Sequence, residues 1–588
     1  MQIKHFLISS LLIAVYAFAN SQDLLTPYEE SGKTETMTYQ QILEWSHKLD
    51  VLSEKVYYLS IGQSGNGYEI PMLIADKDGF KSVSEVKTAN KVILMIEAGI
   101  HAGEPDGTDA GFLLFRDFVE DKIEIPDNIT ILFLPTINPD GCIRRSKYNR
   151  INQNGPKEMG WRTTADYINM NRDFLKAESI EIRAFLKTFN EWLPDFFIDC
   201  HTTDGADYQY VVTYDLTCLG NMGEEHNLWQ KEKYLKPIKS KMDNDGFPIF
   251  RYVNFNKWHD PRSGLRNWIA SPILSEGYSA VQNRPGLLIE THMLKPYHLR
   301  VEGTYKIIYH TMLILSEESK NISRINAEAD IYAASEDFKS KPFPLNFEST
   351  GDSTMVIFKG VEYDIDTSKL TGGLIFNYSD IPVDFELAYF DKLEPTDFVN
   401  LPDAYIFEPV WRDIIELLDC HDIRYYKTKV MHNVNLEAYR FYNEVFSDSP
   451  YEGRQRLISF EIRTDTVTRN LPSGSIIVPI NQRSARLIAH MFEPLSSASL
   501  LKWGFFNRIF EQKEYSESYV MEPMALEMLE SNEDLSTEYE LFLEKNPQVL
   551  NNQWVLLNWF YQKTDYWDKL KNVYPVYKFS GNYLELTK

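Results

Sequence analysis

The stretch Lys91–Asp109, KVILMIEAGIHAGEPDGTD, decides the expected fold. Val92–Ile96 is a short apolar run rich in β-branched residues, which is typical of a buried strand. A glycine-containing turn follows it and places His101 and Glu104 three residues apart. Polar residues directly after a buried strand are typical of the sites of open α/β sheets. The stretch therefore predicts both a sheet and the place of a site.

Strand and helix patterns alternate on both sides of this stretch. Helices are expected at 39–49, after Pro105 and at 179–192, and strands at 56–61, 70–74, 128–135, 195–200 and 286–289. Such alternation indicates an α/β fold with a mixed, mostly parallel sheet and helices on both faces. After about residue 320 the sequence pattern changes. Residues 343–391 and 457–479 alternate between apolar and polar residues as strands do, and an aromatic-rich helical pattern follows them. We expect a C-terminal mixed α/β accessory region there.

Composition and charge exclude several classes of protein. The 588 residues are too many for one ordinary domain, and 43% hydrophobic and 14% aromatic residues are ample for packed cores. A net charge of -25 argues against nucleic acid or anionic membranes as partners. Four cysteines without CxxC spacing form neither a disulfide scaffold nor a metal site, although a Cys142–Cys218 pair stays open.

The N-terminus has the pattern of an export signal. Lys4 and His5 precede an apolar stretch, Phe6–Ala19, and small residues follow it. The alternative is an uncleaved anchor, but the stretch is shorter than the roughly 20 residues that a span needs. We expect residues 1–21 to be a signal peptide and the protein to be secreted or periplasmic, without stable membrane insertion.

Four residues in the first half have the chemistry of a hydrolytic metal site. His101, Glu104 and His201 are two histidines and a carboxylate, the ligand set of a catalytic zinc with an open fourth position. Glu290 ends another predicted strand and can move a proton between water and a leaving amine. HxxE alone is a weak signal, because residues 490–493 repeat it in a helical context where we expect only packing.

At this point the chain resembles the zinc carboxypeptidase family that contains carboxypeptidases A and B. The resemblance covers roughly Tyr39–Glu317 and rests on HxxE, the NPDG turn of residues 138–141, Asn171-Arg172, and the two distant residues His201 and Glu290. It implies one zinc ion held by His101, Glu104 and His201.

The resemblance also implies roles for residues that bind substrate. Glu290 corresponds to the catalytic glutamate, and Asn171 and Arg172 to the pair that holds the terminal carboxylate of a peptide. Arg150 is the first choice for the arginine that polarises the scissile carbonyl. Arg144, Arg145 and Arg162 remain open as alternatives.

Three departures from the family pattern bear on the site. The residue two positions before the Asn-Arg pair is Asn169, where the family commonly has an acid that orients the first zinc histidine. The arginine that some members carry between the first histidine and the glutamate is missing. The mobile tyrosine of the family has no clear match, because Tyr278 lies too close to Glu290 in sequence and Trp268 stands at the expected spacing.

These observations predict a zinc metallocarboxypeptidase that hydrolyses the C-terminal peptide bonds of peptides or proteins. The expected domains are a signal peptide (1–21), the catalytic domain (22–320), a β-rich accessory domain (321–480) and a helical, aromatic-rich region (481–588). One alternative is an amidopeptidase acting on peptidoglycan stem peptides, and another is a catalytically silent peptide-binding protein.

Overall fold

The computed structural model describes residues 24–216 and 221–588, so the predicted signal peptide and Cys218 lie outside the described residues. The chain forms two compact units. Of the described residues, the first comprises those up to Asp403 together with Pro409–Tyr426 and Val478–Ser499, and the second comprises Ala404–Glu408, Lys427–Ile477 and Leu500–Lys588. The domain ranges expected above stay a prediction. Within the described ranges, no helix has the length and apolarity of a bilayer span.

An eight-stranded sheet forms the framework of the first unit, in the order β1-β2-β4-β3-β5-β9-β6-β7. Four of its seven neighbouring pairs are parallel, among them all pairs of the central run β4-β3-β5-β9. This is the mixed, mostly parallel sheet that the sequence predicted. The strands are β1 (Val56–Gln63), β2 (Glu69–Asp76), β3 (Val92–Ala98), β4 (Ile129–Leu134), β5 (Phe196–Thr203), β6 (Val212–Leu216), β7 (Ile249–Arg251) and β9 (Gly286–His292).

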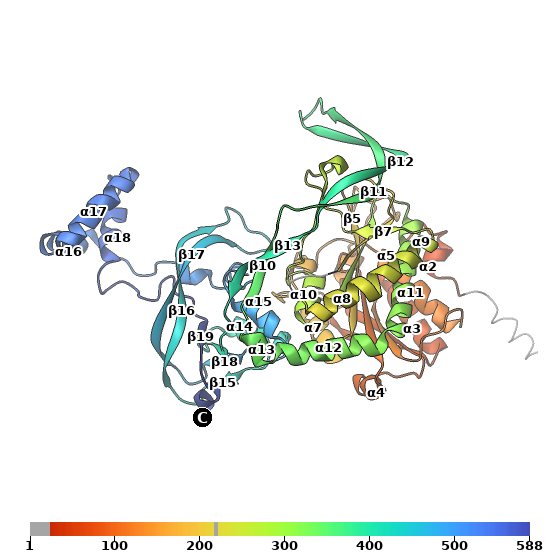
Figure 1. Cartoon of the computed structure of the whole chain (residues 1–588), viewed down its shortest axis with the longest axis horizontal. Helices are drawn as coiled ribbons and strands as arrows, with labels where there is room; N and C mark the ends of the chain where they lie inside the picture. The colour runs from red at the N-terminus through yellow and green to blue at the C-terminus, as the bar shows by residue number, and fades with distance from the viewer. Residues whose placement is uncertain (1–23, 217–220) are drawn as a thin grey trace, which may run out of the picture. The chain divides into compact units, whose positions relative to one another are not determined.

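Alternation along β5 assigns its side chains to two different faces of the sheet. Phe196, Ile198 and Cys200 belong to the large core that also includes residues of α5 (Asp106–Val119) and α11 (Tyr297–Glu317). Phe197 instead packs against Phe185 of α7 (Ile180–Trp192), whose neighbour Phe189 contacts α10 (Ser275–Val281). Helices therefore cover both faces, as predicted (Figure 1). His201, two residues beyond Asp199, shares the face of Phe197.

Of the remaining helices of the first unit, α3 (Tyr39–Leu52) is one that the sequence predicted, at 39–49. Helix α3 begins at a capping box in which Thr38 and Gln41 exchange hydrogen bonds. The others are α2 (Pro27–Glu30), α4 (Val83–Thr88), α6 (Pro139–Ile143), α8 (Glu224–Trp229), α9 (Lys236–Asn244), α12 (Ser319–Ala333), α13 (Glu336–Lys339), α14 (Arg412–Cys420) and α15 (Ala485–Phe492).

A long hairpin from beyond residue 320 is part of the first unit. Strands β11 (Thr354–Thr367) and β12 (Leu374–Phe390) pair with each other, and β12 also pairs with β8 (Leu265–Arg266). Phe358 and Leu387 of the hairpin share a small core with Tyr208 and Tyr210, which follow His201 in the chain. The segment predicted to be β-rich thus packs against the part of the chain that follows β5. Strands β10 (Phe343–Ser349) and β13 (Leu393–Val399) form a second pair.

The second unit is built on the paired strands β16 (His432–Phe446) and β17 (Leu457–Leu471). Strand β19 (Tyr577–Phe579) pairs with β16 and with β14 (Ala404–Phe407), while β15 (Tyr426–Lys427) and β18 (Ile476–Pro479) complete the six-stranded sheet. Helices α16 (Ser518–Ser531), α17 (Glu533–Lys545) and α18 (Gln553–Tyr561) follow, as the helical pattern near the C-terminus predicted.

Candidate metal centre

Two glycines shape the turn that leads from β3 to α5. Gly99 has φ +65°, and a Cβ there would lie 3.0 Å from Thr136 Oγ1. A Cβ on Gly103 would lie 2.4 Å from Arg150 Cδ, so a larger residue would displace that arginine. The Glu104 amide donates to the His101 carbonyl at 2.8 Å, which closes the turn. The turn therefore needs glycine at both positions.

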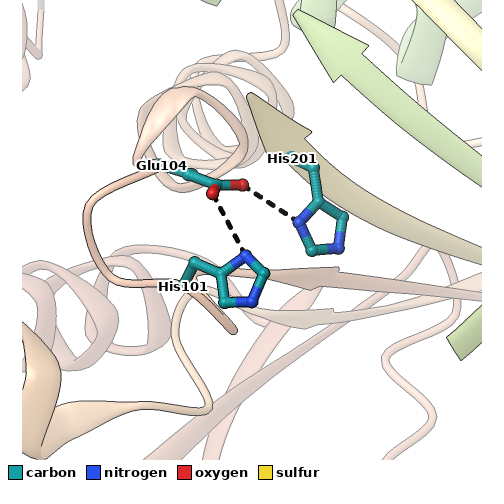
Figure 2. Close-up of side chains that lie close together, drawn as sticks. All are labelled: His101, Glu104 and His201. Atoms are coloured by element: carbon teal, nitrogen blue, oxygen red, sulfur yellow. Dashed lines mark hydrogen bonds and ion pairs between the residues drawn. The ribbon is translucent and has the colours of Figure 1, made fainter. Parts of the chain in front are cut away.

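His101, Glu104 and His201 converge on one point. Their ligand atoms all lie within 4.8 Å of one another, and all three residues are buried. Glu104 Oε1 is 3.1 Å from His101 Nδ1, and Glu104 Oε2 is 3.0 Å from His201 Nδ1. Figure 2 shows both imidazole rings turned with Nδ1 towards this carboxylate. Two nitrogens and a carboxylate that converge in this way fit a tetrahedral zinc site with an open position.

The opposite nitrogen of each histidine is held by a neighbouring side chain. His101 Nε2 lies 2.9 Å from Asn169 Oδ1, the position where the family pattern departs. His201 Nε2 lies 2.6 Å from Asp199 Oδ2, and Asn171 Nδ2 lies 3.1 Å from the same nitrogen. An acceptor oxygen at Nε2 favours a proton there and leaves Nδ1 for a metal ion. The outer contacts therefore suit the donor set.

Charge within the site keeps Glu104 ionised. Burial raises the pKa of a carboxyl group, but Arg150 and the two histidines hold the pKa of Glu104 well below its usual range. Burial lowers the pKa of His101 to about 4, so this imidazole is neutral. Burial also opposes charge on His201, yet the Asp199 and Glu104 carboxylates raise the pKa of His201 well above its usual range. A metal ion would replace its Nδ1 proton.

Glu290 stands beside this cluster on the adjacent strand. It is the register partner of His201 in the parallel pair β5–β9, so both side chains lie on the same face. Among the described residues, Glu290 Oε2 is buried and has no hydrogen-bond partner. Burial, with the Glu104 and Asp199 carboxylates nearby, raises the pKa of Glu290 to about 8. A carboxyl group of this kind can carry a proton near neutral pH.

The predicted arginines differ in how far they are engaged. Arg150 donates to Glu104 Oε1 at 2.7 Å, to the Thr202 carbonyl at 3.1 Å and to Gln153 at 2.8 Å. Its side chain is 14% exposed. Arg162 reaches Glu104 Oε1 at 3.3 Å, and its side chain is 42% exposed. Arg150 is thus packed into the site, whereas Arg162 extends from its rim.

Asn171 and Arg172 also lie at the site. Besides its approach to His201, Asn171 accepts a hydrogen bond from the Ser275 amide at 3.1 Å through Oδ1. Arg172 donates to the Asn171 carbonyl at 2.6 Å. Asn171 therefore lies next to His201, and Arg172 is bonded to the main chain of Asn171.

The sequence reasoning missed two residues that support His201. Asp199 Oδ2 accepts from His201 and from Ser275 Oγ, the latter at 2.5 Å, and Asp199 is fully buried. The signal was present, because residues two apart on a strand lie on one face. Ser275 lies far away in the chain and carried no such signal.

The structure separates the tyrosine candidates. The Tyr278 hydroxyl is 2.9 Å from His421 Nδ1 and accepts from Gln282 at 2.8 Å, so Tyr278 serves the packing of α10. The Tyr252 hydroxyl lies 3.4 Å from Thr203 Oγ1, and burial followed by the charge of Glu290 raises the pKa of Tyr252. A phenol close to the site is therefore supplied by Tyr252.

The second HxxE sequence is engaged in packing. His490 is buried, with Nδ1 3.0 Å from Ser496 Oγ and Nε2 3.0 Å from Asn221 Oδ1. Both ring nitrogens are thus occupied, as expected for a structural histidine. The pairing of Cys142 stays a prediction, because Cys218 lies outside the described residues.

Comparison with known proteins confirms the resemblance to the zinc carboxypeptidases. Residues 42–184 match the family model described as zinc carboxypeptidase. Carboxypeptidase 2 of Trichophyton rubrum is 21% identical over 437 residues, which cover 71% of this chain and 75% of that protein. Carboxypeptidase 2 of Trichophyton equinum is 21% identical over 468 residues, covering 76% of this chain and 80% of that protein. These matches support a metallocarboxypeptidase, a hydrolase.

Solved structures of similar chains include a metallo-carboxypeptidase from Burkholderia cenocepacia, with a TM-score of 0.35, 16% identity and coverage of 48% of this chain and 69% of that one. A carboxypeptidase A from Helicoverpa armigera has a TM-score of 0.36 and 14% identity, covering 56% of this chain and 81% of that one.

Proposed function

We propose that this chain is an exported zinc carboxypeptidase that removes single residues from the C-termini of peptides or proteins. The observation that carries the proposal is the convergence of buried His101, Glu104 and His201, with Glu290 in register beside them. His101 Nδ1, His201 Nδ1 and Glu104 would hold the metal ion. When bound, zinc polarises a carbonyl and makes its water ligand a good nucleophile near neutral pH.

Glu290 is the proton carrier in this proposal. Its Oε2 accepts a proton from the attacking water and passes it to the amine that leaves when the peptide bond breaks. A pKa of about 8 in the metal-free site supports this role, because the group exchanges protons near neutral pH. A bound cation would lower that pKa towards neutrality by its charge.

The arginines divide the remaining tasks. Arg150 neutralises and positions Glu104, since all three of its groups are already bonded within the site. Arg162 has the exposure to reach the scissile carbonyl, and we assign it that role in preference to Arg150. Arg172, positioned by Asn171, would bind the free carboxylate of the peptide, because a guanidinium pairs well with a carboxylate. This contact would restrict cleavage to the last peptide bond.

The proposal is tested by incubating the purified protein with a defined peptide mixture, with and without a zinc chelator, and by reading the products by mass spectrometry. Loss of single C-terminal residues that the chelator abolishes is the expected result. C-terminally amidated copies of the same peptides are the matched control and should stay intact. Cleavage of muropeptides alone would favour the stem-peptide amidopeptidase, and zinc binding without any cleavage would favour the silent binding protein.

Two matched variants test the assignment of the arginines. Arg162→Lys should lower kcat while most of the zinc content is retained, because Arg162 makes a single contact with Glu104, at 3.3 Å, and Arg150 keeps its shorter one at 2.7 Å. Arg150→Lys should weaken zinc binding as well, because a single ammonium group cannot keep the contacts to Glu104, Gln153 and the Thr202 carbonyl by which Arg150 positions the Glu104 carboxylate. Equal zinc content and equal activity loss in both variants would contradict the division of roles.

A further inference from the structure

The second unit carries a helical lobe, α16–α18, whose apolar side chains are only partly buried. Its core consists of four buried residues: Met521, Ala525, Phe560 and Tyr561. Leu526 is 56% exposed, and Leu550 is 54% exposed. A contiguous patch of solvent-exposed apolar side chains marks an interaction site more often than single exposed apolar residues do.

These side chains line a groove with a volume of about 330 Å³. Leucines supply much of its lining, and the aromatic rings of Tyr539 and Phe560 contribute to it: Ala525, Leu526, Leu529, Tyr539, Leu550, Leu556, Leu557 and Phe560, with Glu522, Asn551 and Gln553. Met524 and Met528 are half-buried and pack against the core of the lobe. Unbranched methionines adapt their shape, which suits a surface that receives the apolar face of a helix.

The lobe is strongly acidic. Residues 511–563 contain eleven aspartates and glutamates but only three lysines. Lys563 is paired with Glu538 at 2.7 Å, and Lys513 is paired with Glu511. Glu522 itself lines the groove. The field around the groove therefore attracts positive charge and repels negative charge.

We propose that the groove of α16–α18 binds a cationic amphipathic helix of a partner polypeptide. The apolar face of that helix would cover the leucines, and its lysines or arginines would lie against the carboxylates of the lobe. A second copy of this chain is a poor occupant, because its lobe carries the same charge and the whole chain has a net charge of -25. This site is separate from the metal centre, so it does not depend on the function proposed above.

The test uses the full chain and a fluorescently labelled helical peptide of leucine and lysine with an amidated C-terminus. The amide removes the carboxylate that the peptidase site would hold. We expect saturable binding by fluorescence anisotropy that weakens as salt is raised. The matched peptide with glutamate in place of lysine should not bind. Equal binding of both peptides, or no binding of the cationic one, would overturn the proposal.

Two charge-matched variants locate the binding. Leu526→Lys puts a positive charge into the groove and should weaken binding about tenfold. Leu541→Lys makes the same change at a residue of α17 that is 47% exposed and lies outside the groove lining, and it should leave binding nearly unchanged. Leu550→Lys replaces Leu526→Lys if circular dichroism shows that the latter has lost its fold. Equal effects inside and outside the groove would refute the site. A wild-type dimer that Leu526→Lys dissociates would assign the groove to a second copy and also refute it.

Discussion

Asp199→Asn should weaken zinc binding although Asp199 is not a metal ligand. Its carboxylate lies 2.6 Å from His201 Nε2 and is fully buried, so its charge acts on the imidazole at close range. The asparagine can still accept a hydrogen bond but no longer brings a charge. Changes to such outer partners cost about tenfold to hundredfold in metal affinity, or about 1.4 to 2.8 kcal/mol.

The reciprocal change is available at the other histidine. His101 Nε2 has the neutral partner Asn169 at 2.9 Å, so Asn169→Asp adds the charge that Asp199→Asn removes. We expect Asn169→Asp to tighten zinc binding and the double variant to recover much of the loss. Asp215→Asn is the control, because it neutralises another buried aspartate of the same sheet, which is paired with Arg251 and not with a zinc histidine.

Zinc affinity is measured by competition with a chromophoric chelator, on proteins whose folding has been checked by circular dichroism. Cobalt substitution adds a spectroscopic measurement of the ligand geometry that does not depend on activity. If Asp199→Asn bound zinc as tightly as the wild type, the argument from the carboxylate–histidine contact would be wrong. The argument would also be wrong if Asp215→Asn lowered the zinc affinity by the same amount, since the loss would then reflect general destabilisation of the fold.

Three further changes test other parts of the structure. Glu290→Gln should lower kcat by about 10²- to 10⁴-fold with zinc content unchanged, as measured by peptide hydrolysis and metal analysis. Burial raises the pKa of Asp109 from 3.8 to about 7, so the folded chain keeps a proton that the unfolded chain has lost. The free energy of unfolding should therefore fall as pH rises through this window and be flat above it, and Asp109→Asn should reduce the slope in denaturant titrations. Gly111→Ala should destabilise by about 1 to 3 kcal/mol, because its Cβ would lie 2.1 Å from Phe133 Cζ. Helix propensity alone predicts that Gly111→Ala raises the free energy of unfolding. Calorimetry therefore distinguishes the steric effect from the propensity effect by the direction of the change in melting temperature.

The sequence by itself determined six of the eight strands of the sheet, the helices α3, α5 and α7, and the identity of the converging residues. The apolar run of β3 and the HxxE turn after it are local patterns, and periodicity reports such patterns directly. Parallel strands place their carboxyl ends at one edge of a sheet, so His201 and Glu290 could be assigned to the same site as His101.

Only the tertiary structure decided which partners hold these residues. The contacts of Arg150 and Arg162 depend on the path of a long irregular loop, and a loop path has no periodic signature. Ser275 reaches Asp199 across 76 residues of chain, and Phe358 joins the core of Tyr208 from 150 residues away. Such long-range contacts are selected by the shape and burial of the packed elements, because the chain between them does not prescribe which side chains meet.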